Sequence, residues 1–268
     1  MRHLMTLVLL LLPVPALAAA TPWQDVAPGA RLRLISSDVR HADGTTLVGI
    51  ELDMPDSYKT YWRHPGESGI PTQLDLTGSA GVGDPIIDWP FPTPETSNGY
   101  LDYVYHGPTV LPVRVRATGE AALLKASLVM GVCSDVCVPV RASFSLPLGF
   151  AAADPVQSIR LRQAEALSPI AWDKAAPPFA EITYDAVAKA LRIGLADGSI
   201  DPASILVTTS DPSLIFDAPQ KSPDKRSILL SLRGEDRGPD WTKRPIQLTF
   251  MTSEGSFEAS EQVTASRP

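Results

Sequence analysis

The sequence has few of the residues that usually carry chemistry. It contains two cysteines and four histidines in 268 residues, and aromatic residues make up only 7% of the chain. It has no phosphate-binding loop, no Gly-rich dinucleotide turn and no G-x-S-x-G elbow. Two cysteines are also too few for a scaffold of several disulfides. The position of this one pair must therefore supply its meaning.

Long apolar runs are absent beyond the N-terminus. The first residues, MRHLMTLVLLLLPVPALAAA, combine Arg2 with an apolar run over 4–12 and small residues at 16, 18 and 20. This pattern predicts a signal peptide over residues 1–20 that is cleaved near its end. No later apolar run reaches the roughly 18 residues that a membrane span needs. We therefore expect an exported mature chain without a membrane span.

Basic residues are fewer than acidic ones. Without Arg2 the chain has 22 basic and 30 acidic residues, a net charge of about −8. Such a charge argues against nucleic acid or an anionic membrane as a partner. Proline, at 26 residues, is about twice as frequent as usual. This proline content is typical of a loop-rich all-β protein.

The first half of the chain alternates apolar and polar residues in short segments separated by Gly, Pro, Asp and Asn. The regular spacing of these segments predicts an all-β fold and a β-sandwich. The expected strands are 31–35, 46–53, 73–76, 85–89, 110–117, 123–132 and 138–146.

The period changes after residue 150. Val156, Ile159, Leu161, Ala164 and Leu167 recur at helical intervals and predict a short helix inside a linker over 151–178. The strand pattern then resumes, which predicts a second, smaller β-sandwich-like domain over 179–268. This part contains neither cysteine nor histidine, and we assign it no chemistry. Its expected strands are 181–184, 190–195, 205–208, 228–232, 246–251 and 257–263.

Both cysteines lie in 129-VMGVCSDVCVPV-140. Even-numbered positions before and after the pair are apolar, so the even face is expected to be the core face. Cys133 and Cys137 have odd numbers. The pattern predicts a hairpin with 134–136 as its loop and both thiols on the outer face.

Three roles for this pair stay open on the residues alone: an inert surface disulfide, a redox-active pair, or a metal site. A closed loop of about five residues stabilises by only about 2 kcal/mol, so the pair would be a weak structural crosslink. An exposed disulfide is also easier to reduce. A copper(I) site would combine the thiols with Met130 and with His64 or His106, although Met130 belongs to the core face. Arg141 shares the face of Cys137 and would lower a cysteine pKa.

Four motifs occur in order over residues 25–150: 61-YWRHPGESGIPT-72, 88-DWPFPTPE-95, 103-YVYHGPTVLPV-113 and 133-CSDVCVPV-140. Together they resemble the N-terminal periplasmic module of DsbD-type thiol:disulfide interchange reductases. The resemblance is closest to the ScsB branch, which is associated with suppression of copper sensitivity.

This resemblance implies an immunoglobulin-like redox domain over 21–150 in the periplasm, with Cys133 and Cys137 cycling between dithiol and disulfide. It implies electrons from a thioredoxin-like donor for partners in disulfide isomerisation, cytochrome c maturation or copper tolerance. We expect no cofactor and assign no metal-ligating residue. Because the family's membrane conduit is missing from this sequence, a separate conduit of the DsbD type is expected.

Family members can carry an aromatic cap loop over the cysteines, but the corresponding 95-ETSNG-99 has no aromatic residue. Phe91 or Tyr100 is the expected shield instead. The motif 61–72 is expected to be a loop in which Tyr61 and Trp62 either anchor to the core or border the cysteines. Cys137 is the expected partner-facing sulfur, because Arg141 follows it on the same face. The remaining residues expected to shape the site are His64, Tyr103, Tyr105 and His106.

Overall fold

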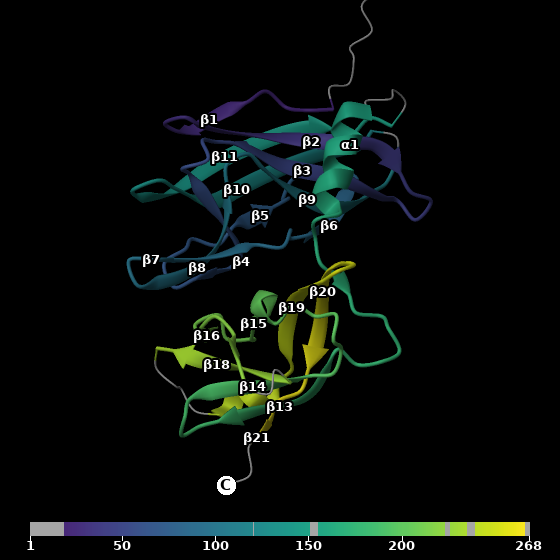
Figure 1. Ribbon diagram of the computed structural model, residues 1–268. Helices are drawn as coiled ribbons and strands as arrows, with labels where there is room; N and C mark the ends of the chain where they lie inside the picture. The colour runs from purple at the N-terminus through teal and green to yellow at the C-terminus, as the bar shows by residue number, and fades with distance from the viewer. Residues whose placement is uncertain (1–18, 120, 151–154, 223–225, 235–238, 266–268) are drawn as a thin grey trace, which may run out of the picture.

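The computed structural model describes residues 19–119, 121–150, 155–222, 226–234 and 239–265. Residues 1–18 of the predicted signal peptide lie outside this range. Within it, no helix has both the length and the apolar character to cross a membrane. Two β-sandwiches follow one another along the chain, with the helix α1 (Pro155–Glu165) between them in sequence (Figure 1).

Two sheets form the first sandwich. One has the order β1 (Gln24–Ala27), β2 (Ala30–Arg40), β3 (Thr45–Asp53), β9 (Thr109–Ala117) and β6 (Val82–Ile87). The other has the order β11 (Cys137–Pro147), β10 (Leu123–Cys133), β4 (Lys59–Gly66), β8 (Tyr100–His106) and β7 (Thr93–Ser97), and β5 (Gln73–Asp75) also pairs with β10.

The core of this sandwich follows the predicted parity. Leu124, Leu128, Met130 and Val132 of β10 are buried against apolar residues of the facing sheet. The expectation that even positions form the core face is therefore confirmed.

The helix α1 packs on the outer face of the first sheet. Leu161 is fully buried there. It lies over Gly49, where an added Cβ would be 2.6 Å from Leu161 Cδ2. Arg160 pairs with the buried carboxylate of Glu51. The predicted helix is thus present and is docked on the first sandwich.

The second sandwich also has two sheets. One has the order β12 (Ile170–Ala171), β20 (Gly255–Glu261), β19 (Ile246–Thr252) and β15 (Leu206–Thr208). The other has the order β16 (Ile215–Phe216), β18 (Ser227–Arg233), β14 (Ala190–Leu195), β13 (Phe179–Asp185) and β21 (Thr264–Ala265), with β17 (Gln220–Lys221) also on β18. Two short 3-10 helices complete it, Pro202–Ser204 and Pro239–Lys243.

The all-β prediction, with one helix between two sheet regions, is confirmed. We keep 21–150, 151–178 and 179–268 as proposed domain boundaries. The prediction of a loop over 61–72 is wrong for its first part, because β4 continues to Gly66. Thr60, Tyr61 and Trp62 are all buried, so β4 is covered on both faces and shows no alternation of apolar and polar residues.

The hairpin of β7 and β8 was also missed. Asn98 and Gly99 form its turn with φ of 52° and 84°. Asn-Gly is a common pair in two-residue hairpin turns, since both positions need positive φ. The supposed cap loop 95–99 is therefore the end of a regular hairpin.

Candidate functional site

The two cysteines close the tip of the β10–β11 hairpin. Cys133 and Cys137 are directly opposed in the register and form a disulfide, and their Cα atoms are 4.0 Å apart. Ser134, Asp135 and Val136 are the exposed loop between them, as predicted.

The two sulfurs differ in their surroundings. Cys133 is fully buried, whereas Cys137 is exposed. The expectation that both thiols project outward is wrong for Cys133. Its strand β10 is interior to the sheet and pairs there with Lys59 of β4, while Cys137 begins the edge strand β11. Tyr61 and Val104 cover the odd-numbered face at this end and form a small buried cluster with Cys133.

The hydroxyl of Tyr61 touches both sulfurs. Its oxygen lies 2.9 Å from Cys133 Sγ and 3.0 Å from Cys137 Sγ. Burial, followed by the negative charge of Asp102, raises the pKa of Tyr61 to about 12. The hydroxyl therefore stays protonated near neutral pH and can donate a hydrogen bond to either sulfur.

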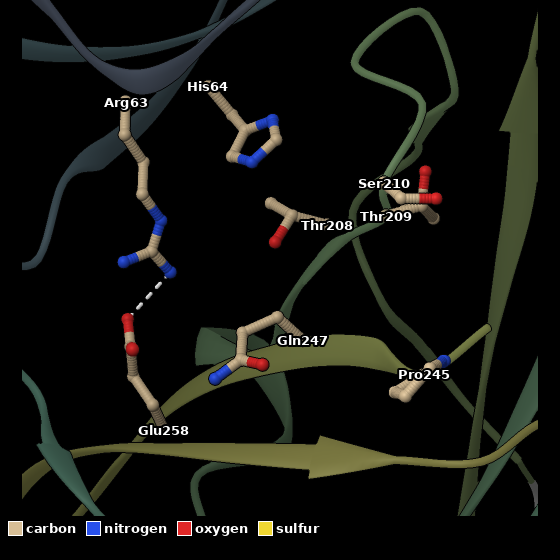
Figure 2. A pocket seen from close by; sticks show the side chains of 8 residues that line it. All are labelled: Arg63, His64, Thr208, Thr209, Ser210, Pro245, Gln247 and Glu258. Atoms are coloured by element: carbon tan, nitrogen blue, oxygen red, sulfur yellow. Dashed lines mark ion pairs between the residues drawn. The ribbon is translucent and has the colours of Figure 1, made fainter.

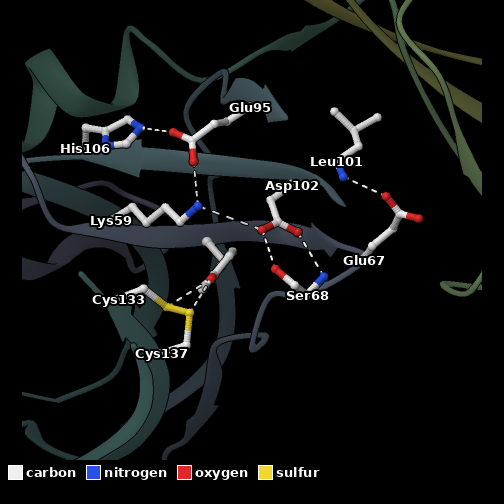
Figure 3. A network of polar contacts seen from close by, with 10 residues as sticks. Lys59, Glu67, Ser68, Glu95, Leu101, Asp102, His106, Cys133 and Cys137 are labelled. Atoms are coloured by element: carbon white, nitrogen blue, oxygen red, sulfur yellow. Dashed lines mark hydrogen bonds and ion pairs between the residues drawn. A yellow bond between two sulfur atoms is a disulfide. The ribbon is translucent and has the colours of Figure 1, made fainter. Parts of the chain in front are cut away.

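A polar network lies beside the pair (Figure 3). Lys59 Nζ is 2.5 Å from Glu95 Oε1 and 3.9 Å from Asp102 Oδ2. His106 Nε2 is 2.8 Å from Glu95 Oε2. The hydrogen bond from Lys59 is the main cause that lowers the pKa of Glu95. Because Lys59 pairs in register with Cys133, this network places a cation and two carboxylates next to the disulfide.

Sequence reasoning missed Lys59, Glu95 as a charged partner, and Asp102. All three lie on strands that were not predicted. The Asn98–Gly99 hairpin signal would have located β7 and β8, and with them Glu95 and Asp102.

The segment 66–70 covers the ring of Tyr61 on the side that faces away from the sheet. An added Cβ at Gly69 would lie 2.4 Å from Tyr61 Cδ1. An added Cβ at Gly131 of β10 would lie 2.9 Å from both Tyr61 Cδ2 and Ile70 Cβ. Glycine at these two positions allows the ring to sit tightly between the sheet and the segment, so the hydroxyl is held at the sulfurs.

The two aromatic residues that were expected to shield the cysteines, Phe91 and Tyr100, lie elsewhere. Phe91 packs against the core and lines a groove of about 880 Å³ beside α1, together with Tyr105, whose hydroxyl donates to Pro90 O at 2.7 Å. Tyr100 is 53% exposed next to the hairpin turn. Tyr61 occupies the position over the sulfurs for which Phe91 or Tyr100 was proposed.

Most of the remaining candidates do not meet the cysteines. Trp62 is fully buried in the core, with its ring 5.7 Å from that of Tyr103. Arg141 is exposed on β11, opposite Val129. Of the aromatic and histidine candidates, the structure brings Tyr61 to the sulfurs and His106 into the adjacent network.

His64 belongs to a cavity of about 340 Å³ between the two sandwiches (Figure 2). Burial, and then the charge of Arg63, lowers the pKa of His64 to about 4. Arg63 NH2 pairs there with Glu258 Oε1 of β20 at 2.6 Å. The ion pair at this cavity thus connects β4 to the second sandwich.

The ligands expected for copper(I) are not brought together. Met130 is fully buried on the core face of β10, on the opposite side of the strand from Cys133. His64 faces the cavity and His106 pairs with Glu95. Among the described residues, no group of three or more His, Cys, Asp or Glu side chains is placed to hold a metal ion.

A hairpin disulfide with one exposed sulfur, on an immunoglobulin-like sandwich, has the features of a thiol–disulfide exchange domain. Residues 32–148 match the family described as the N-terminal domain of thiol:disulfide interchange protein DsbD. This part of the chain is a DsbD-type N-terminal domain, as the resemblance predicted.

The N-terminal periplasmic domain of ScsB from Proteus mirabilis matches with a TM-score of 0.71 and 21% identity, over 92% of this chain and 98% of that one. This match shows a shared fold that extends over both sandwiches. The tandem immunoglobulin domains of titin align with a TM-score of 0.19 and 10% identity, over 88% of this chain and 96% of that one, and carry no argument. No curated protein matches the sequence.

Proposed function

We propose that this chain is a periplasmic thiol–disulfide exchange protein that relays reducing equivalents through Cys133 and Cys137. One observation carries the proposal: the disulfide exposes Cys137, while Cys133 is buried beside a hydroxyl that stays protonated. The family match over 32–148 supports it, as does the periplasmic origin of the similar ScsB domain. The signal peptide over 1–20 is the proposed route of export.

The exchange proceeds through Cys137. A donor thiolate attacks Cys137 Sγ, the bond between the two cysteine sulfurs breaks, and Cys133 leaves as a thiolate. The donor's second thiol then attacks the donor sulfur in the mixed disulfide and releases Cys137. Two electrons are thereby transferred, the donor ends as a disulfide, and this chain ends as a dithiol. Reversal of these steps reduces an acceptor disulfide.

The Tyr61 hydroxyl favours the departure of Cys133. A thiolate accepts a charge-assisted hydrogen bond from this hydroxyl, and such bonds are about twice as strong as neutral ones. Lys59 offsets part of the negative charge of Glu95 and Asp102 beside the same sulfur. The proposed donors are thioredoxin-like proteins or a separate membrane conduit of the DsbD type. The proposed acceptors act in disulfide isomerisation, cytochrome c maturation or copper tolerance.

The test is reduction of the oxidised wild-type chain by a thioredoxin-like protein in a series of redox buffers. The fraction reduced is read by alkylation with a mass tag. We expect reduction at potentials typical of catalytic pairs, about −120 to −270 mV. A potential below about −300 mV, with no exchange with the donor, would identify a structural disulfide instead.

A further inference from the structure

Arg233 of the second sandwich contacts two residues of the first sandwich, Glu67 and Gly99. Arg233 ends β18, and its guanidinium contacts three groups. Its Nε lies 2.8 Å from Glu67 Oε2, its NH1 lies 2.5 Å from Asp217 Oδ1, and its NH2 donates to Gly99 O at 2.5 Å. Glu67 and Gly99 belong to the first sandwich, and Asp217 to the second. We call Arg233 with these three partners the Arg233 clamp.

Glu67 belongs to the segment 66–70, which we call the cover of Tyr61. Gly99 is in the turn of the β7–β8 hairpin, which carries Glu95. Glu67 Oε2 also accepts the backbone N–H of Leu101 at 2.6 Å (Figure 3). The backbone N–H of Glu67 donates to Leu101 O at 3.0 Å. A single arginine therefore ties the hairpin turn to the segment that follows β4.

That segment leads directly to Tyr61. Ser68, next to Glu67, donates its backbone N–H to Asp102 Oδ1 at 2.9 Å and its hydroxyl to Asp102 Oδ2 at 2.5 Å. Gly69 then closes on the ring of Tyr61, whose hydroxyl lies between the two sulfurs. The contacts run without a gap from Arg233 through 67–69 to the disulfide.

Segments of this kind can open locally at a lower free energy than global unfolding, when few buried contacts hold them. The Arg233 clamp adds charge-assisted hydrogen bonds at the outer side of the segment, which are stronger than neutral ones. Opening of the segment would uncover Tyr61 and, beneath it, Cys133.

We propose that Arg233 is a positioning residue of the redox site: the second sandwich holds the segment 66–70 closed over Tyr61, and thereby keeps Cys133 buried while Cys137 stays exposed. This inference rests on the proposed function, since it assigns the second sandwich a role in the same exchange.

The test measures the accessibility of Cys133 alone. In a Cys137→Ala background, Cys133 is the only thiol, and its alkylation by N-ethylmaleimide reports opening of the cover. We expect Arg233→Ala to raise this rate at least about tenfold, which corresponds to about 1.4 kcal/mol. Arg233→Lys keeps the charge but not the three-way geometry, and should raise the rate less. The matched control is Glu258→Gln, which breaks a different ion pair between the sandwiches, with Arg63, and should stay within twofold of the background.

An effect through Glu67 is tested by a double-mutant cycle. Glu67→Gln alone should raise the alkylation rate, and adding Arg233→Ala to it should raise the rate by less than the product of the two single effects. If Arg233→Ala does not fold, Arg233→Lys and Glu67→Gln give the answer. Rates within twofold of the background for every folded clamp variant, or an equal rise with Glu258→Gln, would overturn the proposal.

A second readout separates positioning from general loosening. In the chain with both cysteines, Arg233→Ala should shift the dithiol/disulfide equilibrium toward the disulfide, because the Tyr61 hydroxyl is no longer held at the Cys133 thiolate. A tenfold shift equals about 30 mV. An unchanged potential in Arg233→Ala would contradict the positioning role. The alkylation rates do not depend on a donor, so the clamp can fail while the wild-type chain still exchanges with a thioredoxin-like protein, and the reverse also holds.

Discussion

The two sandwiches share an architecture but differ in what they bury. The first buries charged and polar groups around its cysteine hairpin, among them Asp102, Thr60 and the Tyr61 hydroxyl. The second has an aromatic core in which Phe250 lies 5.0 Å from Phe179 and 5.6 Å from Trp172, measured between ring centroids. Buried polar groups lower stability unless every one is paired, whereas aromatic clusters add to it. The difference supports the proposals that the first sandwich carries the exchange chemistry and that the second positions its cover.

The largest expected effect comes from the aromatic core of the second sandwich. Phe250→Ala should destabilise this sandwich by about 3–5 kcal/mol, because a fully buried ring leaves a cavity. Denaturant unfolding followed by tryptophan fluorescence measures the loss. Met251→Ala is the control on the same strand, because Met251 is 41% exposed and should cost less than about 1 kcal/mol. Equal losses in the two variants would contradict the assigned core.

A smaller effect is expected at the cover of the site. Gly69→Ala places a methyl group 2.4 Å from the Tyr61 ring and should destabilise the first sandwich by about 1–3 kcal/mol. It should also raise the alkylation rate of reduced Cys133. Gly83→Ala is the control, since no atom lies within 4 Å of its added Cβ. If Gly69→Ala behaves like Gly83→Ala, the segment does not hold Tyr61 in place.

Removing one hydroxyl tests the contact with the sulfurs. Tyr61→Phe should slow reduction of the disulfide by dithiothreitol about tenfold, because a hydrogen bond to a thiolate is worth about 1.5–3 kcal/mol. The pKa of Tyr61 is raised to about 12, so the hydroxyl stays a donor and the ratio of rates should be constant between pH 6 and 9. Tyr100→Phe, at the 53% exposed tyrosine, should leave the rate unchanged. A ratio near one for Tyr61→Phe would remove the hydroxyl from the mechanism.

A pH-dependent effect is expected at the cavity between the sandwiches. The pKa of His64 is lowered to about 4 in the folded chain, from 6.5 for the free side chain. The unfolded chain therefore binds more protons between these values, so stability falls as the pH drops from 6.5 towards 4, with a slope below about 1.4 kcal/mol per pH unit. His64→Asn should flatten this part of the curve of unfolding free energy against pH. An unchanged slope in His64→Asn would show that His64 is not buried in its neutral form.

Alternation predicted the fold well where one face of a strand meets solvent. In β10 and β11 the apolar residues fall on even positions, and from these the hairpin, its loop and the core face follow directly. The strand β4 could not be predicted from alternation, because both its faces are covered. Its residues Pro65 and Gly66 also suggest a loop.

The site was predicted only in part, for a related reason. The period-two pattern places Cys133 on the odd face, but it cannot show that Tyr61, 72 residues earlier in the chain, covers that face. The pairing of Cys133 with Lys59 and the reach of Arg233 to Glu67 are likewise long-range contacts. Local sequence periodicity carries no information about such contacts, so the difference between the two cysteines appears only in three dimensions.

The most direct test of this difference compares the two single-cysteine chains. Cys133→Ala leaves the exposed Cys137, and Cys137→Ala leaves the buried Cys133. Each is mixed with oxidised glutathione at neutral pH, and formation of the mixed disulfide is followed by mass spectrometry. The account predicts that the Cys133→Ala chain reacts at least about ten times faster, because only its exposed thiolate can reach the disulfide of glutathione and displace one glutathione thiolate. Equal rates, or faster reaction of the Cys137→Ala chain, would contradict it.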